Sequence, residues 1–308
     1  MIFYIIKRMM TALLALFVIA TLTFVLMNLI PGDPFTNEKS IPEQVLKNLR
    51  AHYGLDQPLI IQYFKYMAGI ITLDFGPSIT SDTRTVNELI LSGFPVSAVL
   101  GIQALVIAVV FGMTLGIIAA IKHNGWLDYL SMVIAILGLS VPSFVLSTVL
   151  INYFAIKLEW LPVATWGTWR HTVLPSLALA VGPLAYIARL TRSSILEVLT
   201  SDYVQTAIAK GVTGSRLIFR HILRNALIPV VTVLGPISAG ILTGSFVIEQ
   251  IFGIPGIGKY FVQSISDRDY PVILGTTIFY SAILILFILI IDLTYGFLDP
   301  RIKLARRR

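Results

Sequence analysis

Residues 201–229 read SDYVQTAIAKGVTGSRLIFRHILRNALIP, and this stretch decides the fold. Its first half, Asp202–Gly211, predicts a short helix that Ser201 caps and Gly211 terminates. A second helix is expected from about Ser215. On that helix arginines spaced four residues apart form a basic stripe, Arg216, Arg220 and Arg224, and an apolar side carries Leu217, Ile218 and Ile222. The stretch therefore predicts a helix–glycine–helix hairpin that is too polar to lie inside a membrane.

Two interpretations of this hairpin remain open from its pattern alone. A rigid hairpin between two membrane spans is suited to being pushed by a partner protein. The same hairpin could instead lie at the membrane surface, with its arginines among lipid phosphates.

The rest of the chain is strongly apolar. Of its 308 residues, 56% are hydrophobic and 13% are charged, whereas soluble domains carry about 25% charged residues. A membrane span needs roughly 20 apolar residues, and six windows qualify: Met9–Ile30, Phe94–Ile121, Tyr129–Ile156, Val173–Leu190, Ala226–Ile248 and Val272–Tyr295. The first window is longer than a signal-peptide core, so we expect it to be retained. We predict an all-α polytopic membrane protein with six transmembrane helices, which excludes a soluble enzyme, a nucleic-acid module and a secreted scaffold.

Charge placement predicts the orientation in the membrane. With both termini in the cytoplasm, the inner segments hold 14 basic and four acidic residues, and the outer segments hold nine basic and 11 acidic residues. This asymmetry follows the positive-inside rule. The net charge of +7 is therefore a topology signal and does not indicate a nucleic-acid partner. We expect a multi-pass membrane protein with both termini in the cytoplasm.

The spans divide the chain into three parts. Residues 1–93 hold the first transmembrane helix and a structured extracytoplasmic loop, in which Ser40–Tyr53 and Pro58–Leu73 predict two helices. Residues 94–296 form a core of five transmembrane helices with a cytosolic loop at about 191–225, and residues 297–308 form a basic cytosolic tail. The outer loop fits a lid packed on the bundle or a docking site for an outside partner.

Residues 207–211, Ala207-x3-Gly211, look like the core of the cytosolic loop shared by permease subunits of bacterial ABC importers. The fuller pattern begins Glu-Ala-Ala, and Gln205 and Thr206 depart from it here; Arg224 stands where the pattern has proline. Further stretches agree along nearly the whole chain: Pro31–Pro34, His52–Asp56, Asp74–Ser78, Phe94–Ser97, Val141–Phe144, Ala188–Ser194, Ile251–Gly258, Arg268–Tyr270 and Asp299–Ile302. Together they resemble the B-type permease subunit of oligopeptide ABC importers, in the peptide and nickel branch of binding-protein-dependent transporters.

This resemblance implies a multi-chain machine of the bacterial plasma membrane with the type I (MetI-like) permease fold. A sister permease completes a heterodimeric pore in membrane lipid, two cytosolic ATPase subunits use ATP and Mg²⁺, and an extracytoplasmic peptide-binding lipoprotein delivers oligopeptides. Dipeptides or nickel chelates are the alternative cargo. The chain itself is expected to be non-catalytic and to bind no cofactor. The ATPase-coupling residues implied are Asp202, Tyr203, Gln205, Thr206, Ala207, Lys210, Gly211, Arg216 and Arg220.

Two glycine-rich stretches are further candidates. The fifth span is unusually small and polar, which fits either close helix packing or the lining of a wide pore. Its pore-lining candidates are Gly235, Ser238, Gly240, Thr243, Gly244 and Ser245. The following loop fits an outer gate at the pore mouth, with Gly253, Pro255, Gly256 and Gly258. Its Gly-x4-Gly-Lys spacing imitates a phosphate loop, but Tyr260 stands where Mg²⁺ coordination needs Ser or Thr.

No catalytic or metal-binding constellation is expected. The four histidines, His52, His123, His171 and His221, are scattered over separate loops, and cysteine is absent. The rival function is a secondary transporter driven by an ion gradient. That carrier would need an ionisable group in the membrane, and Asp292 or Glu249 would supply it.

Overall fold

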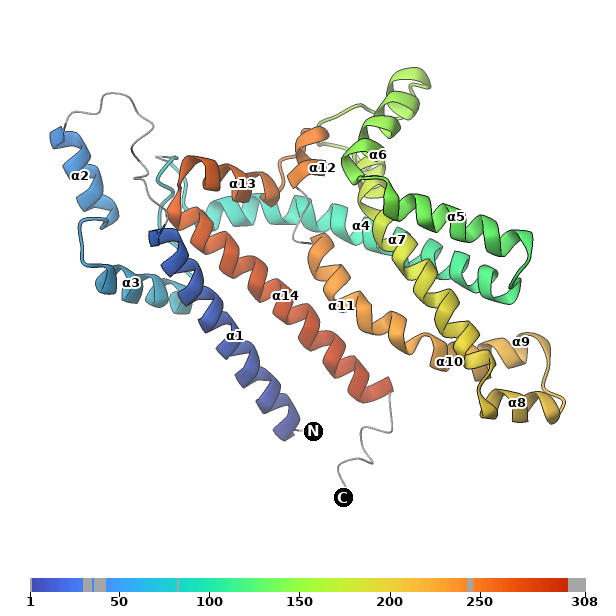
Figure 1. The fold of residues 1–308 in the computed structure, drawn as a ribbon. Helices are drawn as coiled ribbons and strands as arrows, with labels where there is room; N and C mark the ends of the chain where they lie inside the picture. Colours follow the sequence, from blue (N-terminus) through green and yellow to red (C-terminus); the bar gives the residue numbers. More distant parts are fainter. Residues whose placement is uncertain (1, 30–34, 36–42, 82, 243–245, 299–308) are drawn as a thin grey trace. The chain divides into compact units, whose positions relative to one another are not determined.

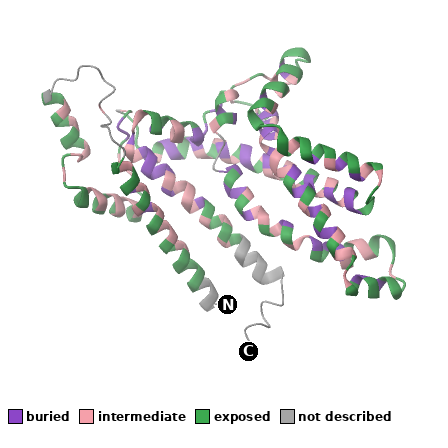
Figure 2. Ribbon diagram, in the orientation of Figure 1, coloured by how far each residue is buried: buried purple, intermediate pink, exposed green. Residues whose placement is uncertain are grey.

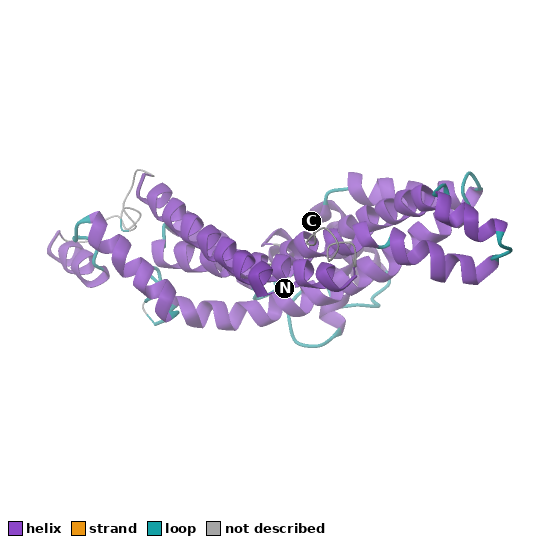
Figure 3. Cartoon of the chain, turned by 90° about the horizontal axis from the view of Figure 1, so that it is seen from below, coloured by secondary structure: helices purple, strands orange, loops and turns teal. Residues whose placement is uncertain are grey.

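The computed structural model describes residues 2–29, 35, 43–81, 83–242 and 246–298. Within these ranges the chain is helical, and the one β-type pairing is an isolated bridge between Pro77 and Thr85 (Figure 3). The helices in Figure 1 are α1 Ile2–Leu29, α2 Glu43–Tyr53, α3 Leu59–Thr72, α4 Val86–Ile121, α5 Trp126–Ser140, α6 Ser143–Leu150, η1 Ile151–Lys157, α7 Arg170–Leu199, α8 Asp202–Ala209, α9 Gly214–Leu217, η2 Ile218–Ile222, α10 Leu223–Ala226, α11 Ile228–Leu242, α12 Phe246–Ile251, α13 Ile257–Asp267 and α14 Tyr270–Leu298. Here η1 and η2 are π-helical.

The chain forms two compact units. Unit 1 comprises Met1–Val96 and Pro255–Ile285, and unit 2 comprises Ser97–Ile254 and Leu286–Arg308. Helices α4 and α14 each contribute to both units.

Unit 1 is built where the start of α4 packs against α13 and the start of α14. Its core consists of Val86, Leu89, Ile90, Ile257 and Val272. A Cβ on Gly93 would lie 2.9 Å from the Ile257 backbone, so the two helices approach more closely there than a larger residue would allow. Small residues at such crossings are typical of membrane bundles.

Unit 2 is built around α7, which packs against α4, α5, α6 and α11. Its core consists of Ala104, Ala108, Ala180, Ile187, Val230 and Ile241. Gly112 and Gly116 face α7, and a Cβ on Gly116 would lie 2.5 Å from the Ala188 carbonyl oxygen. This small-residue stripe on α4 brings the two backbones together.

The membrane spans match the expected number once one bend is included. Five helices are long and apolar enough to cross a bilayer, and the pair Trp126–Ser140 and Ser143–Lys157 makes a sixth span if counted as one. We predicted that third span as one helix, but it bends by 105° between the two helices. Pro142 explains the break, because proline lacks an N–H and forces the preceding residue out of helical geometry; Val141 has ψ 119°.

Most of the remaining elements follow the sequence pattern, with two extensions and one helix, α13, that the sequence did not predict. Helices α2 and α3 lie where the outer-loop pattern predicts them. Helix α4 begins at Val86, before the predicted span, and α7 continues to Leu199, well past Leu190. Pro175 and Pro183 stay inside α7; a bundle tolerates such residues when neighbouring groups satisfy the freed backbone.

Candidate functional site: the helical hairpin of unit 2

The hairpin predicted from residues 201–229 is present at the end of α7. Its first leg is α8, and its second leg runs through α9, η2 and α10. Gly211 has φ +81° and its N–H donates to the Ile208 carbonyl over 2.9 Å, so it terminates the first leg in the left-handed conformation that favours glycine. Ser201 holds the cap position, but its hydroxyl donates to the Val198 carbonyl over 2.5 Å instead of capping α8.

The inner side of the hairpin is apolar and packed. Val204 and Ala207 of α8 are buried. Val204 belongs to a core with Ala120, Ile195, Ile222, Leu223 and Ala226. The second leg also packs Leu217 and Ile218 against this core, as its apolar side predicts. Ala207 therefore packs inside this chain, whereas the other motif residues Gln205, Thr206 and Gly211 are exposed.

The outer side of the hairpin is exposed (Figure 2). The exposed coupling candidates are Asp202, Tyr203, Gln205, Thr206, Lys210, Gly211, Arg216 and Arg220, together with Arg224. Among these polar groups stand two exposed apolar side chains, Ile208 and Phe219, the latter 71% exposed. Neither Arg216 nor Arg220 makes an ion pair with a residue that the structure describes. The surface thus mixes unpaired positive charge with apolar contact area.

The two legs are held together by side chains from the motif. Asn225 Nδ2 donates to the Tyr203 hydroxyl over 2.8 Å, which joins α8 to α10. Gln205 Nε2 donates to the Leu199 carbonyl over 2.9 Å and ties α8 back to the end of α7. These bonds, with the apolar core beneath them, make the hairpin a body continuous with α7.

A buried ion pair, which the sequence reasoning missed, ties α7 to the α4–α5 turn. Arg192 Nε lies 2.6 Å from Asp128 Oδ1, and its Nη2 donates to Oδ2 over 2.7 Å. The Asn124 N–H donates to Oδ2 over 3.0 Å, and His123 Nδ1 lies 3.3 Å from the same oxygen. The Asp128 side chain is 3% exposed. We call this group the clamp; bidentate pairs of this kind fix orientation as well as distance.

The clamp stands close to the hairpin along α7. Seven residues separate Arg192 from Leu199, which is about two helical turns. A movement of the hairpin that tilts α7 therefore reaches the start of α5 through a rigid contact. In the sequence, Asp128 and Arg192 stand as opposite charges in two predicted inner segments. Their spacing gives no indication that they pair.

The described pore candidates differ in burial. Gly235 and Ser238 are buried within unit 2, and Gly240 is exposed with open space where a Cβ would stand. Thr243, Gly244 and Ser245 lie outside the described residues. Among the described candidates, then, Gly240 is the one that presents open surface.

The glycine-rich loop after α12 is divided between the units. Gly253, exposed with φ +61°, lies in unit 2. In unit 1, Pro255 is exposed, and Gly256 and Gly258 are buried at the start of α13. Gly253 alone has the left-handed backbone that a side chain would strain.

The two acids considered for ion coupling have different settings. Glu249 is buried, and Ser97 Oγ donates to its Oε1 over 2.7 Å. Asp292 belongs to α14, and its side chain lies outside what the structure describes. Among the described residues no group of three or more His, Asp or Glu could hold a metal ion.

The fold is shared with solved importer structures. The chain aligns with an amino acid ABC transporter solved with histidines at TM-score 0.54 and 17% identity, covering 68% of this chain and 93% of that one. It aligns with the inward-facing methionine ABC transporter MetNI at TM-score 0.52 and 17% identity, covering 67% and 92%. These matches confirm the predicted type I permease fold.

Sequence similarity to known proteins extends over nearly the full chain. The chain is 58% identical to the dipeptide transport system permease protein DppB of Bacillus subtilis (strain 168), over 99% of both chains. It is 46% identical to the oligopeptide transport system permease protein OppB of Haemophilus influenzae, over 97% of this chain and 99% of that one. The family model for the binding-protein-dependent transport system inner membrane component matches residues 112–304, and the model for the N-terminal part of such components matches residues 1–100. The chain therefore belongs to the family of binding-protein-dependent transport system inner membrane components.

Proposed function

We propose that this chain is the permease subunit of an ATP-driven peptide importer. The observation that carries the proposal is the full-length similarity to relatives named as dipeptide and oligopeptide permeases, at 58% and 46% identity. Family membership also removes the support for a carrier driven by an ion gradient, since members of the family depend on a binding protein. Glu249, buried against Ser97, then acts as a local packing group.

In this proposal the outer side of the hairpin is the contact for a cytosolic ATPase subunit. Ile208 and Phe219 supply apolar area and Arg216 and Arg220 supply charge. A partner that pushes on this surface moves α7, and the clamp carries the movement to α5. ATP and Mg²⁺ are used by the ATPase subunits, and the chain itself catalyses no reaction.

The remaining assembly follows from the same proposal. A sister permease completes a pore that opens alternately to the two sides, with Gly240 and the candidates at residues 243–245 along it and Gly253–Gly258 at its outer mouth. Both termini lie in the cytoplasm of a bacterial cell, residues 1–93 contribute the outer loop and residues 297–308 form the basic tail. A peptide-binding lipoprotein delivers the cargo from outside.

The cargo proposed is an oligopeptide, and the alternative is a dipeptide. Relatives of both names match over the full length. Uptake of a labelled tetrapeptide, in competition with unlabelled dipeptides and tetrapeptides, measures the preference in cells that express the whole importer. Loss of tetrapeptide uptake on deletion of this chain supports the oligopeptide proposal. Loss of labelled dipeptide uptake on the same deletion, with tetrapeptide uptake unchanged, overturns it.

A disulfide crosslink tests the coupling role. Because the chain has no native cysteine, any crosslink must come from the introduced cysteine. Ile208→Cys is the suitable variant because Ile208 is 41% exposed, whereas Ala207 is buried. With a second cysteine in the docking cleft of the co-expressed ATPase, we expect a crosslink whose yield changes on addition of ATP. Trp160→Cys, at a residue that is 60% exposed and lies on the opposite side in the proposed topology, is the control. No crosslink at Ile208, despite thiol labelling from the cytosolic side, would overturn the coupling role.

A further inference from the structure

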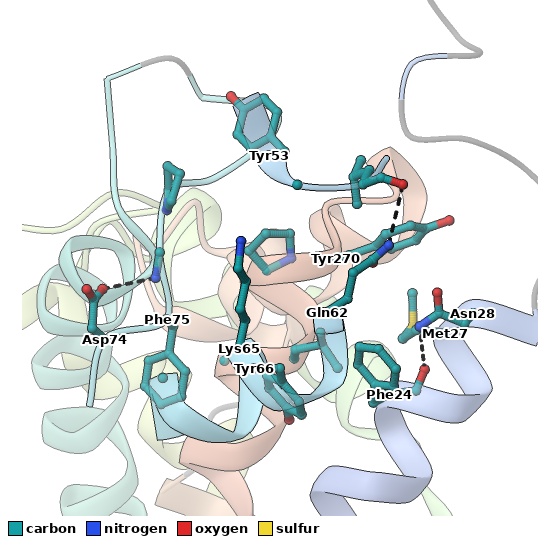
Figure 4. A pocket seen from close by; sticks show the side chains of 18 of the residues that line it. Phe24, Met27, Asn28, Tyr53, Gln62, Lys65, Tyr66, Asp74, Phe75 and Tyr270 are labelled. Atoms are coloured by element: carbon teal, nitrogen blue, oxygen red, sulfur yellow. Dashed lines mark hydrogen bonds between the residues drawn. The ribbon is translucent and has the colours of Figure 1, made fainter. Parts of the chain in front are cut away.

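Unit 1 contains a cavity that the proposed transport function does not use. Its volume is about 280 Å³, and it lies between the last turns of α1, α3 and the start of α14 (Figure 4). Residues 52–55 and 74–77 complete the wall. Its apolar surface comes from Phe24, Met27, Tyr66, Phe75 and Leu274. The chemistry of this cavity indicates what it binds.

Lys65 is the one Lys or Arg among the described lining residues, and its ammonium group points into the cavity beside Gly54 (Figure 4). It makes no hydrogen bond or ion pair with a described residue. Two other polar groups of the lining are engaged: Asp74 Oδ1 accepts from the Gly76 N–H over 3.1 Å, and Gln62 Nε2 donates to the Gln57 carbonyl over 2.7 Å. An ammonium group over an apolar surface favours an anionic partner.

The cavity lies beside a surface suited to lipid. Helix α3 has 14 residues, too few to span a bilayer, and none of its residues is buried. Ile60, Phe64 and Ile71 are exposed along one side of it, while Lys65, Tyr66 and Gly69 face the cavity. A short helix with one apolar exposed side lies flat in a membrane interface.

Contacts with α1 fix the depth of α3. Thr21 Oγ1 and the Tyr63 hydroxyl are 2.8 Å apart, and the ring of Phe24 stacks on that of Tyr66 with centroids 5.9 Å apart. Because α1 is a candidate membrane span that ends at Leu29, these contacts place α3 beside the last third of that span, toward its outer end in the proposed topology. Tyrosine and lysine side chains gather at that level in membrane proteins.

We propose that this cavity binds the headgroup of one membrane phospholipid. The phosphate binds the Lys65 ammonium, the glycerol portion occupies the cavity, and the acyl chains extend over the exposed apolar residues of α1 and α3. The lipid fastens the outer-loop helices to the membrane. The site is separate from the coupling hairpin, so it stands independently of the transport proposal.

Native mass spectrometry of the purified full chain, titrated with phosphatidylglycerol, tests the site. We expect one lipid to bind more tightly than the rest. Lys65→Glu weakens that binding about tenfold, the size of one lost charge-assisted hydrogen bond. Lys65→Arg retains it, because the guanidinium group also binds phosphate. Lys47→Glu, the same charge change at an exposed residue of α2 outside the cavity, is the matched control and leaves it unchanged.

Three ligands separate the possible sources of the anion. A diglucosyl diacylglycerol, which lacks phosphate, binds wild type and Lys65→Glu equally if the proposal holds. Displacement of the lipid by millimolar inorganic phosphate would assign the cavity to free phosphate and overturn the lipid proposal. Displacement by dialanine would assign it to the transported cargo and also overturn it. Equal lipid affinity for Lys65→Glu and Lys47→Glu overturns it directly.

Discussion

Among the described residues, each unit contains one fully buried aspartate at the start of a helix, and the two are satisfied in opposite ways. In unit 2, Asp128 faces a cation, Arg192, in the bidentate clamp. In unit 1, Asp269 precedes α14, and its donors among the described residues are all neutral: Ser78 Oγ at 2.5 Å, Thr80 Oγ1 at 2.9 Å, the Thr80 N–H at 3.2 Å and the Val272 N–H at 3.3 Å. We call this second group the latch. The clamp depends on charge, whereas the latch depends on the number of hydrogen bonds.

This difference matches the proposed work of the two regions. The clamp stands near the hairpin, where a partner is proposed to push, and an ion pair holds its geometry while helices tilt. The latch fastens the segment at residues 78–80 to the N-terminus of α14, where a carboxylate also complements the helix dipole. Four hydrogen bonds to one carboxylate keep this loop in a single position.

Removal of the latch carboxylate is expected to have the largest effect. Asp269→Ala leaves two hydroxyls and two backbone N–H groups without their acceptor, and we expect a loss of about 3 kcal/mol in the free energy of unfolding. Chemical denaturation of the purified chain measures this loss. Hydrogen exchange should rise in the first turns of α14 and at residues 78–81 and stay unchanged in α7. An equal rise in hydrogen exchange in both units of Asp269→Ala would contradict the separation of latch and clamp.

Loss of charge at the clamp comes next. Asp128→Asn keeps the shape of the side chain but leaves Arg192 without its anion. Because the Arg192 side chain is 24% exposed, water solvates part of the charge, and we expect a loss of about 2 kcal/mol in the free energy of unfolding. Arg192→Gln and the double variant complete a mutant cycle. We expect a coupling energy above about 1 kcal/mol, because residues in direct contact are not additive. Additive losses would mean that the two side chains act separately.

The same isosteric change at the latch is expected to cost less. In Asp269→Asn the amide oxygen can take the place of Oδ2, which accepts three of the four hydrogen bonds, and no cation is left alone, so we expect about 1 kcal/mol. The comparison of Asp128→Asn with Asp269→Asn in one denaturation series measures how far charge, as opposed to hydrogen bonding, stabilises each region. A larger loss at Asp269 than at Asp128 would reverse our assignment of the two mechanisms.

The sequence predicted local features well and long-range pairs poorly. The spans, the two outer-loop helices and the hairpin follow from apolar windows, helical spacing and Gly211, all of which act within a few residues. Asp128 and Arg192 are 64 residues apart, and Ser78 and Asp269 are 191 apart, so no local pattern joins them. The bend at Pro142 could have been predicted from proline chemistry. Burial of Ala207 could not, since it depends on which side of α8 meets the second leg.

The smallest expected effect on stability belongs to the exposed side of the hairpin. Ile208→Ala removes an apolar side chain that packs on little of this chain, so we expect less than about 0.5 kcal/mol change in unfolding free energy. If Ile208 contacts an ATPase, the same variant lowers peptide uptake and the ATPase activity of the whole complex, because buried apolar area is lost at that interface. Val204→Ala, its buried neighbour on α8, provides the contrast: it destabilises the hairpin by about 1 kcal/mol or more through the cavity it leaves. Unchanged uptake in Ile208→Ala, alongside reduced uptake in Val204→Ala, would show that the hairpin needs its fold but that this surface touches no partner.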